Sequence, residues 1–341
     1  MSEPSALRVG PSLSYPEPLT SSCPVSVIDT LVARLRQGDT RALARAISLV
    51  ENEAPEAAAV LSACFPQTGR ALRLGITGAP GAGKSTLVDR LARHYREAGH
   101  TVGVLAVDPT SPFTGGALLG DRIRFQERLN DEQFYARSMA TRGSLGGLAL
   151  GTADAALVLE ASGKEVLLIE TVGVGQDEVE IARLADITMV VLVPGMGDDV
   201  QSLKAGVMEI ADIFVINKAD RDGADRVEQE IRGLQSLAAT GAGWASPVVR
   251  TIATTGEGVE RLLTAVGEMR VWLNDDNRLA ERRARHWERR MEAMLRAELM
   301  RKARHNGLDA ARMREYAVRV AAGDQDPWKL VASLAKDLTG P

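Results

Sequence analysis

The chain has 341 residues, of which 41 are basic and 45 acidic, and the resulting net charge of −4 does not favour a nucleic-acid-binding protein. A hydrophobic content of 45% and a mean hydropathy of −0.08 are typical of a soluble globular protein, and no apolar run is long enough to span a membrane. The only cysteines, Cys23 and Cys64, can form neither a disulfide framework nor a CxxC metal pair, which favours a cytoplasmic location.

The chain begins with a tail that is followed by helices. Residues 1–24 contain five prolines among serines and lack the apolar core of a signal peptide, so we expect a flexible tail. Residues 25–70 are predicted to form an N-terminal helical segment, with Thr40 capping one helix and Ala54–Cys64 forming another.

The apolar run Leu72–Thr77 is predicted to be a strand that leads into the phosphate-loop pattern GxxxxGK[ST] and then a helix over residues 84–98. Glycines let successive N–H groups face phosphate oxygens, Lys84 can reach the β and γ phosphates, and the Ser85 hydroxyl can ligate Mg²⁺. The predicted phosphate-binding residues are Gly78, Ala79, Pro80, Gly81, Ala82, Gly83, Lys84, Ser85 and Thr86. This pattern predicts a protein that binds a nucleoside triphosphate.

Five further apolar runs are predicted to be strands buried on both faces. They are Val102–Val107, Glu165–Glu170, Ile187–Val193, Ile213–Ile216 and Pro247–Ile252. A predicted helix at Leu148–Ser162 makes the strands on either side of it parallel, whereas the second strand of Ras-like folds returns by a hairpin. We therefore expect an α/β fold of the P-loop NTPase type over residues 71–275, with a mostly parallel, doubly wound sheet.

Acidic residues follow two of these strands. Glu170 can hold a magnesium-bound water, and the Gly173 N–H can sense the γ-phosphate. Asp108 can meet the metal or the attacking water, or it can simply cap its loop. The predicted metal-binding set is Ser85, Asp108 and Glu170, and the predicted catalytic set is Lys84, Asp108, Glu170 and Gly173.

The segments after these acidic residues bear on the rate of hydrolysis. Val174 has no polar group with which to orient water, and Gln176 is the nearest substitute, so we expect slow hydrolysis that a partner stimulates. Asp121 and Arg122 lie in the segment after Asp108, where Asp121 could equally cap a helix.

The motif Asn217-Lys218-Ala219-Asp220 directly follows an apolar strand and matches the guanine-reading pattern NKxD. Asp220 can accept hydrogen bonds from the N1–H and 2-amino groups of guanine, and adenine would leave this carboxylate unpaired. Asn217 can hold the loop and N7, and the stem of Lys218 can cover the base. Ala253 and Thr254 occupy the place where a backbone N–H contacts guanine O6, although an ordinary turn explains them equally well.

Residues 276–341 differ in composition from the rest of the chain. Residues 278–304 contain nine arginines, Lys302 and four glutamates, and apolar residues follow one helical stripe through this segment: Trp287, Met291, Met294, Leu295 and Leu299. The basic run is either a solvated helix face or a helical dimerisation arm, and RNA binding is disfavoured because aromatic residues are not interleaved. Two more helices are predicted, at Asp309–Ala322 and Trp328–Leu338.

Five segments in combination resemble the MeaB/ArgK family of GTPases, of the SIMIBI class: GAPGAGKST, VDPTSPFTGGALLGDR, ETVGVGQDE, PGMGDDVQSLKAG and NKAD. The resemblance implies a homodimeric chaperone that uses GTP to gate cofactor loading of an adenosylcobalamin-dependent acyl-CoA mutase, protects it and helps to reactivate it. The client could be a methylmalonyl-CoA, isobutyryl-CoA or 2-hydroxyisobutyryl-CoA mutase. The chain shows no cobalamin-binding signature, so we expect the corrinoid to stay on the mutase or its loading enzyme.

The resemblance also implies three switch segments, at residues 108–121, 170–178 and 195–204. The switch residues that it implies are Asp121, Arg122, Gln176, Asp198, Asp199, Gln201 and Lys204, of which the last four relay the nucleotide state to the mutase. From composition alone, the third segment is only a polar loop made flexible by glycine.

Three other functions compete with this interpretation. A nickel-delivering metallochaperone GTPase would need metal ligands, and four histidines and two cysteines are few for that. A P-loop kinase or transport-associated ATPase would have no use for NKxD. A structural dimer in which the nucleotide only stabilises the fold would show no response to a mutase.

Overall fold

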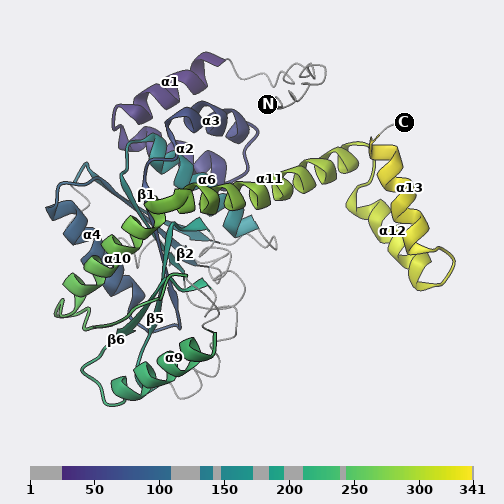
Figure 1. Cartoon of the computed structure of the whole chain (residues 1–341). Helices are drawn as coiled ribbons and strands as arrows, with labels where there is room; N and C mark the ends of the chain where they lie inside the picture. The colour runs from purple at the N-terminus through teal and green to yellow at the C-terminus, as the bar shows by residue number, and fades with distance from the viewer. Residues whose placement is uncertain are drawn as a thin grey trace, which may run out of the picture.

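The computed structural model describes residues 25–108, 131–140, 147–171, 184–195, 210–238 and 243–339 (Figure 1). Within these residues, seven strands form one sheet in the order β3-β2-β4-β1-β5-β6-β7, and every pair of neighbours is parallel. The strands are β1 (Leu72–Gly78), β2 (Val102–Asp108), β3 (Phe134–Ala140), β4 (Val166–Thr171), β5 (Ile187–Leu192), β6 (Ile213–Asn217) and β7 (Val248–Thr251). The predicted parallel, doubly wound α/β fold is confirmed.

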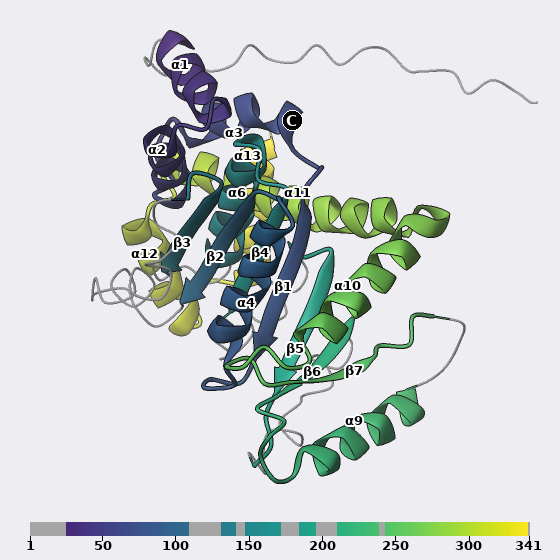
Figure 2. The same cartoon turned by 90° about the vertical axis from the view of Figure 1, so that its left-hand side faces the viewer.

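Helices cover both faces of the sheet, which is why its central strands are buried and rich in apolar residues. α4 (Lys84–Glu97) and α10 (Val259–Asn274) pack on one face, where Leu74, Leu168 and Met189 point toward them. α6 (Gly147–Ala161) and α9 (Ala224–Ala238) pack on the other. Figure 2 shows α4 in front of the sheet, running along β4 and β1.

The edge strand β3 was not predicted from the sequence, which assigned only a helix to the connection between β2 and β4. β3 pairs in parallel with β2 along its whole length, from Phe134 opposite Val102 to Ala140 opposite Asp108. Its apolar run is interrupted by Arg137 and Ser138. Arg137 is accommodated because it pairs with Glu51 of the N-terminal helices at 2.5 Å.

The N-terminal helices form a further layer outside α6. They are α1 (Val25–Arg36), α2 (Thr40–Glu51) and α3 (Ala57–Cys64), with a short 3₁₀ turn, η1, at Phe65–Gln67. Apolar residues of α2 join the core that α6 shares with the sheet. Thr40 was predicted as an N-cap, and this is wrong: Asp39 is the N-cap of α2, and its Oδ1 accepts hydrogen bonds from the N–H groups of Arg41 (2.9 Å) and Ala42 (3.1 Å).

The C-terminal part of the chain is helical, as predicted. A 3₁₀ turn, η3 (Asp275–Asn277), leads into the 28-residue helix α11 (Arg278–His305), and α12 (Ala310–Ala321) and α13 (Pro327–Thr339) follow. Figure 1 shows α11 running outward from the sheet to α12 and α13 at its far end. No helix among the described residues combines the length and apolar character needed to cross a membrane.

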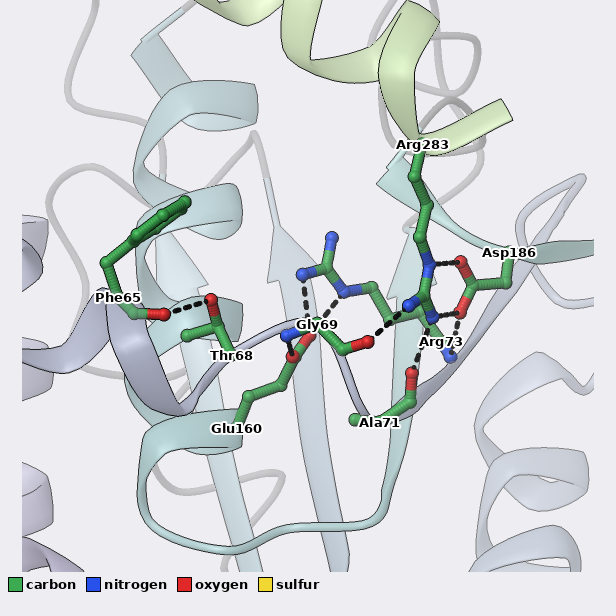
Figure 3. A network of polar contacts seen from close by, with 8 residues as sticks. All are labelled: Phe65, Thr68, Gly69, Ala71, Arg73, Glu160, Asp186 and Arg283. Carbon is green, nitrogen blue, oxygen red and sulfur yellow. Dashed lines mark hydrogen bonds and ion pairs between the residues drawn. The ribbon is translucent and has the colours of Figure 1, made fainter. Parts of the chain in front are cut away.

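The base of α11 is fixed to the sheet by ion pairs between arginines and aspartates. Arg283 forms a two-pronged pair with Asp186, at 2.8 and 2.7 Å, and also donates to the carbonyl oxygen of Ala71 at 2.9 Å (Figure 3). Arg282 pairs likewise with Asp212, at 3.0 and 2.8 Å. Asp186 and Asp212 directly precede β5 and β6, so α11 is attached where these strands begin.

Further along α11, Arg290 pairs with Asp154 of α6, and Trp287 packs edge-on against Phe65 with ring centres 5.4 Å apart. Burial raises the pKa of both Asp154 and Asp212, and the arginine beside each opposes that rise. In the first half of the basic run, Arg282, Arg283 and Arg290 therefore point toward the sheet and its helices. The interpretation of this half as a solvated helix face does not hold.

Candidate nucleotide-binding site

The candidate site lies where the strands end, at the edge of the sheet opposite the base of α11. β1 ends at Gly78, β4 ends next to Glu170, and β6 ends at Asn217. In open parallel sheets, ligands bind outside the carboxyl ends of the strands. The sheet order places β1 between β4 and β5, so the phosphate-loop strand is central.

The phosphate loop joins β1 to α4 in a conformation that requires glycine. Gly78 has φ 136°, and a Cβ there would lie 2.0 Å from the carbonyl oxygen of Val191. Gly83 has φ 87°, and a Cβ there would lie 2.4 Å from Asn217 Nδ2. Lys84 begins α4, is 5% exposed, and donates from Nζ to the carbonyl oxygens of Gly78 (2.6 Å) and Ala79 (2.9 Å). Its ammonium group is thus held beside the loop that would receive the phosphates.

Ser85 and Glu170 bring two side-chain oxygens together beside the loop. The Ser85 hydroxyl donates to Glu170 Oε1, and Glu170 is 7% exposed. Behind them, the hydroxyls of Thr77 and Thr171 are hydrogen-bonded at 2.9 Å and tie β1 to β4. Hydroxyl and carboxylate oxygens suit Mg²⁺, which is usually bound by one or two such protein groups together with phosphate oxygens and water. The residues present therefore fit this metal.

The NKAD residues are tied directly to the phosphate loop. Asn217, 2% exposed, donates from Nδ2 to the carbonyl oxygen of Ala82 (2.8 Å), and the Lys218 ammonium donates to that of Gly81 (2.8 Å). Asn217 Oδ1 accepts from the Thr251 hydroxyl (3.2 Å) and the Ala253 N–H (3.0 Å). One asparagine thus connects the phosphate loop to the loop after β7, while Asp220 stays exposed.

The loop after β7 has a contact that the sequence analysis missed. Arg90 of α4 donates from Nε to the carbonyl oxygen of Ala253 at 2.9 Å, and from Nη2 to that of Thr254. Arg90 is 163 residues away from Ala253 in the chain, so no local pattern could have paired them. Ala253 is buried and Thr254 exposed, which leaves the second residue open to a ligand.

The side chains of nine predicted site residues are not among those that the structure describes. Asp108 ends β2, and nothing further is described of its side chain. Eight others lie outside the described residues: Gly173, Asp121, Arg122, Gln176, Asp198, Asp199, Gln201 and Lys204. In the part of the chain that is described, no three His, Cys, Asp or Glu side chains gather into a metal-binding cluster.

The parallel sheet, the phosphate loop and the guanine-type motif bonded to it define a P-loop protein of the GTPase class. The chain belongs to the MeaB family: the family described as "Methylmalonyl Co-A mutase-associated GTPase MeaB" matches residues 43–307. That match includes the phosphate loop, NKAD and the whole of α11.

Similar proteins agree with this membership. A "Putative GTPase" of Pyrococcus abyssi is 47% identical over 317 residues, which cover 92% of this chain and 98% of that protein. GTPase ArgK of Escherichia coli is 38% identical over 258 residues, covering 73% and 78% of the two chains. A crystal structure titled LAO/AO transport system kinase superposes with a TM-score of 0.69 at 26% identity, over 94% of this chain and 100% of that one.

Proposed function

We propose that this protein is a GTP-driven chaperone of an adenosylcobalamin-dependent acyl-CoA mutase, either methylmalonyl-CoA mutase or a relative of it. In this role it gates loading of the cofactor, protects the mutase and helps to reactivate it, without itself binding cobalamin. The observation that carries the proposal is the match to the mutase-associated GTPase family over residues 43–307. Such coupling requires the GTP and GDP states to bind the mutase with different affinities.

The described residues support a division of labour in GTP hydrolysis. Lys84, already held at the loop, would move its ammonium from the carbonyl oxygens of Gly78 and Ala79 to the β and γ phosphates. Ser85 and Glu170 would hold Mg²⁺, which when bound would neutralise charge on the phosphates. Asp108 and Gly173 complete the proposed catalytic set. Because Val174 cannot orient water, we propose slow intrinsic hydrolysis that the mutase accelerates.

Base recognition is proposed for the NKAD residues and the loop after β7. Asp220 would accept from the N1–H and 2-amino groups of guanine, with Asn217 and Lys218 fixing the loop around it. Ala253 and Thr254 lie beside the NKAD residues, because Asn217 accepts a hydrogen bond from the Ala253 N–H.

The proposed domain organisation is a GTPase domain over residues 71–275, an N-terminal helical segment over residues 25–70, and a dimerisation arm over residues 276–341. The assignment of a dimerisation arm is supported by apolar side chains on α11 that are more than one-third exposed: Met291, Met294, Leu295, Leu299 and Met300. An exposed stripe of this kind on a helix that extends away from its domain suits pairing with a second copy.

The test is GTP turnover by the full chain, alone and with purified methylmalonyl-CoA mutase, with ATP as the control nucleotide. We expect slow turnover alone, acceleration on adding the mutase, and no turnover of ATP. Lys84→Ala should lose both basal and stimulated activity, which excludes a contaminating GTPase. Unchanged turnover with every acyl-CoA mutase tried would contradict the chaperone role and leave only a guanine-nucleotide hydrolase.

A further inference from the structure

The contact between Arg90 and the loop after β7 carries an inference about how the base is read. We propose that Arg90 is a positioning residue for guanine recognition, which holds the Ala253–Thr254 peptide so that the Thr254 N–H donates to guanine O6. The proposal rests on guanine-nucleotide binding, and it adds a residue outside both the phosphate loop and NKAD.

The first step is the orientation of one peptide plane. The Ala253 carbonyl accepts from Arg90 Nε at 2.9 Å, so it points toward α4. In a trans peptide, the carbonyl and the N–H lie in one plane and point in opposite directions. The Thr254 N–H belongs to this same peptide, and it therefore points away from Arg90. Among the described residues, this N–H makes no hydrogen bond, and Thr254 is exposed.

The second step excludes the neighbouring donors in the same loop. The Ala253 N–H is already bonded to Asn217 Oδ1 at 3.0 Å, and the Thr255 N–H to the carbonyl oxygen of Ile252 at 3.1 Å. The Gly256 N–H also donates to Ile252, at 2.9 Å. Of the backbone donors from residue 253 to 256, the Thr254 N–H is the one left for a ligand. Its flanking carbonyls, of Ala253 and Thr254, are the two that Arg90 holds.

The third step is chemical. A charged donor on a carbonyl polarises the peptide and strengthens its N–H as a donor. Guanine presents an acceptor at position 6, where adenine presents an amino group. A fixed N–H there therefore favours guanine, and with adenine this N–H would lack an acceptor. Arginine suits this role because its planar fork can bond two successive carbonyls at once, which a lysine ammonium cannot do with the same geometry.

The test is a comparison of three diphosphates that differ only in the base. GDP has O6 and the 2-amino group, 6-thio-GDP replaces O6 with the weaker acceptor sulfur, and IDP keeps O6 but lacks the 2-amino group. Their dissociation constants are measured for the wild type, Arg90→Met, which keeps the aliphatic stem, and Arg90→Lys. Arg93→Ala is the matched control, because Arg93 lies on the same helix and its ion pair with Glu97, one turn along, is exposed.

We expect the wild type to bind 6-thio-GDP about tenfold more weakly than GDP, the loss typical of one good hydrogen bond. In Arg90→Met this ratio should fall to about threefold or less, Arg90→Lys should lie between, and Arg93→Ala should match the wild type. The ratio of IDP to GDP affinity, which reports on Asp220, should be the same in all four proteins.

Two results would overturn the proposal. One is a ratio of the 6-thio-GDP and GDP dissociation constants that is close to one in the wild type, or that is the same in Arg90→Met as in the wild type. The other is an equal weakening of all three ligands, which would make Arg90 a general support for the loop. Neither result bears on the chaperone role, because that role is tested by mutase-stimulated turnover of the wild type.

Discussion

At the phosphate loop, Gly83 is held at φ 87° with no space for a side chain. We expect Gly83→Ala to push Asn217 away, break its bond to Ala82, and weaken GDP binding by tenfold or more. Gly81→Ala is the matched control, because Gly81 also has a positive φ, 75°, but a Cβ there would meet nothing within 4 Å. It should cost only backbone strain of about 1 kcal/mol. Titration with fluorescent GDP checks both variants, and equal losses would show that strain, rather than the clash, decides affinity.

Cys64 provides a prediction about pH. It is fully buried, and burial raises the pKa of its thiol from 9.0 to about 11. The stability that this shift contributes is complete below pH 9.0 and is lost as the pH rises toward 11. In a Cys23→Ser background at pH 8, we expect a thiol reagent to react with the native protein at least about a hundredfold more slowly than with the denatured protein. Similar rates in the two states would mean that Cys64 is accessible.

At the scale of elements, the attachment of α11 depends on buried charge. Arg283→Ala would leave Asp186, 3% exposed, without its arginine, and one hydrogen bond from the Arg73 N–H would remain. We expect the free energy of unfolding to fall by about 3 kcal/mol, as for other broken buried pairs. Arg285→Ala, on an exposed position of the same helix, should change it by less than about 0.5 kcal/mol. Urea denaturation followed by circular dichroism measures both, and equal effects would contradict the anchoring role of Arg283.

Elements with a strong local pattern were predictable from the sequence, and those that depend on distant partners were not. The central strands were found because both of their faces are buried, whereas β3 is an edge strand whose Arg137 needs Glu51, far back in the chain, to become acceptable. Asp39 was missed as a cap because Thr40, beside it, is also a residue type that is favoured at the N-cap.

The candidate site shows the same limit. The phosphate loop and NKAD are contiguous motifs, and their proximity follows from parallel strands ending at one edge. Arg90 lies outside any motif, and its partners are distant backbone carbonyls, which carry no side-chain signature. Arg282 and Arg283 could not be separated from solvated arginines, because their aspartates lie just before β5 and β6, far away in the chain.

At the scale of the whole molecule, the exposed stripe on α11 predicts the oligomeric state. Met294→Glu combined with Leu295→Glu should place charges in the proposed interface and convert a dimer into single chains of 36.5 kDa. Arg289→Glu, on an exposed position nearer the sheet, should leave the dimer intact. Light scattering at micromolar concentration gives the mass, and GDP binding confirms that the chains remain folded. A wild type that is already monomeric would contradict the dimer proposal.

The length of β1 has a consequence for how such a dimer would work. Arg283 bonds to Ala71 just before the strand, and the phosphate loop begins at its other end, Gly78, seven residues away. At about 3.3 Å per residue, roughly 20 Å of stiff strand separates the arm's attachment from the nucleotide. Joining two copies through their arms would therefore leave both nucleotide edges uncovered. The dimer would then be bivalent. A multi-subunit client bound to the nucleotide edge of one copy would meet the nucleotide edge of the other copy at a high local concentration.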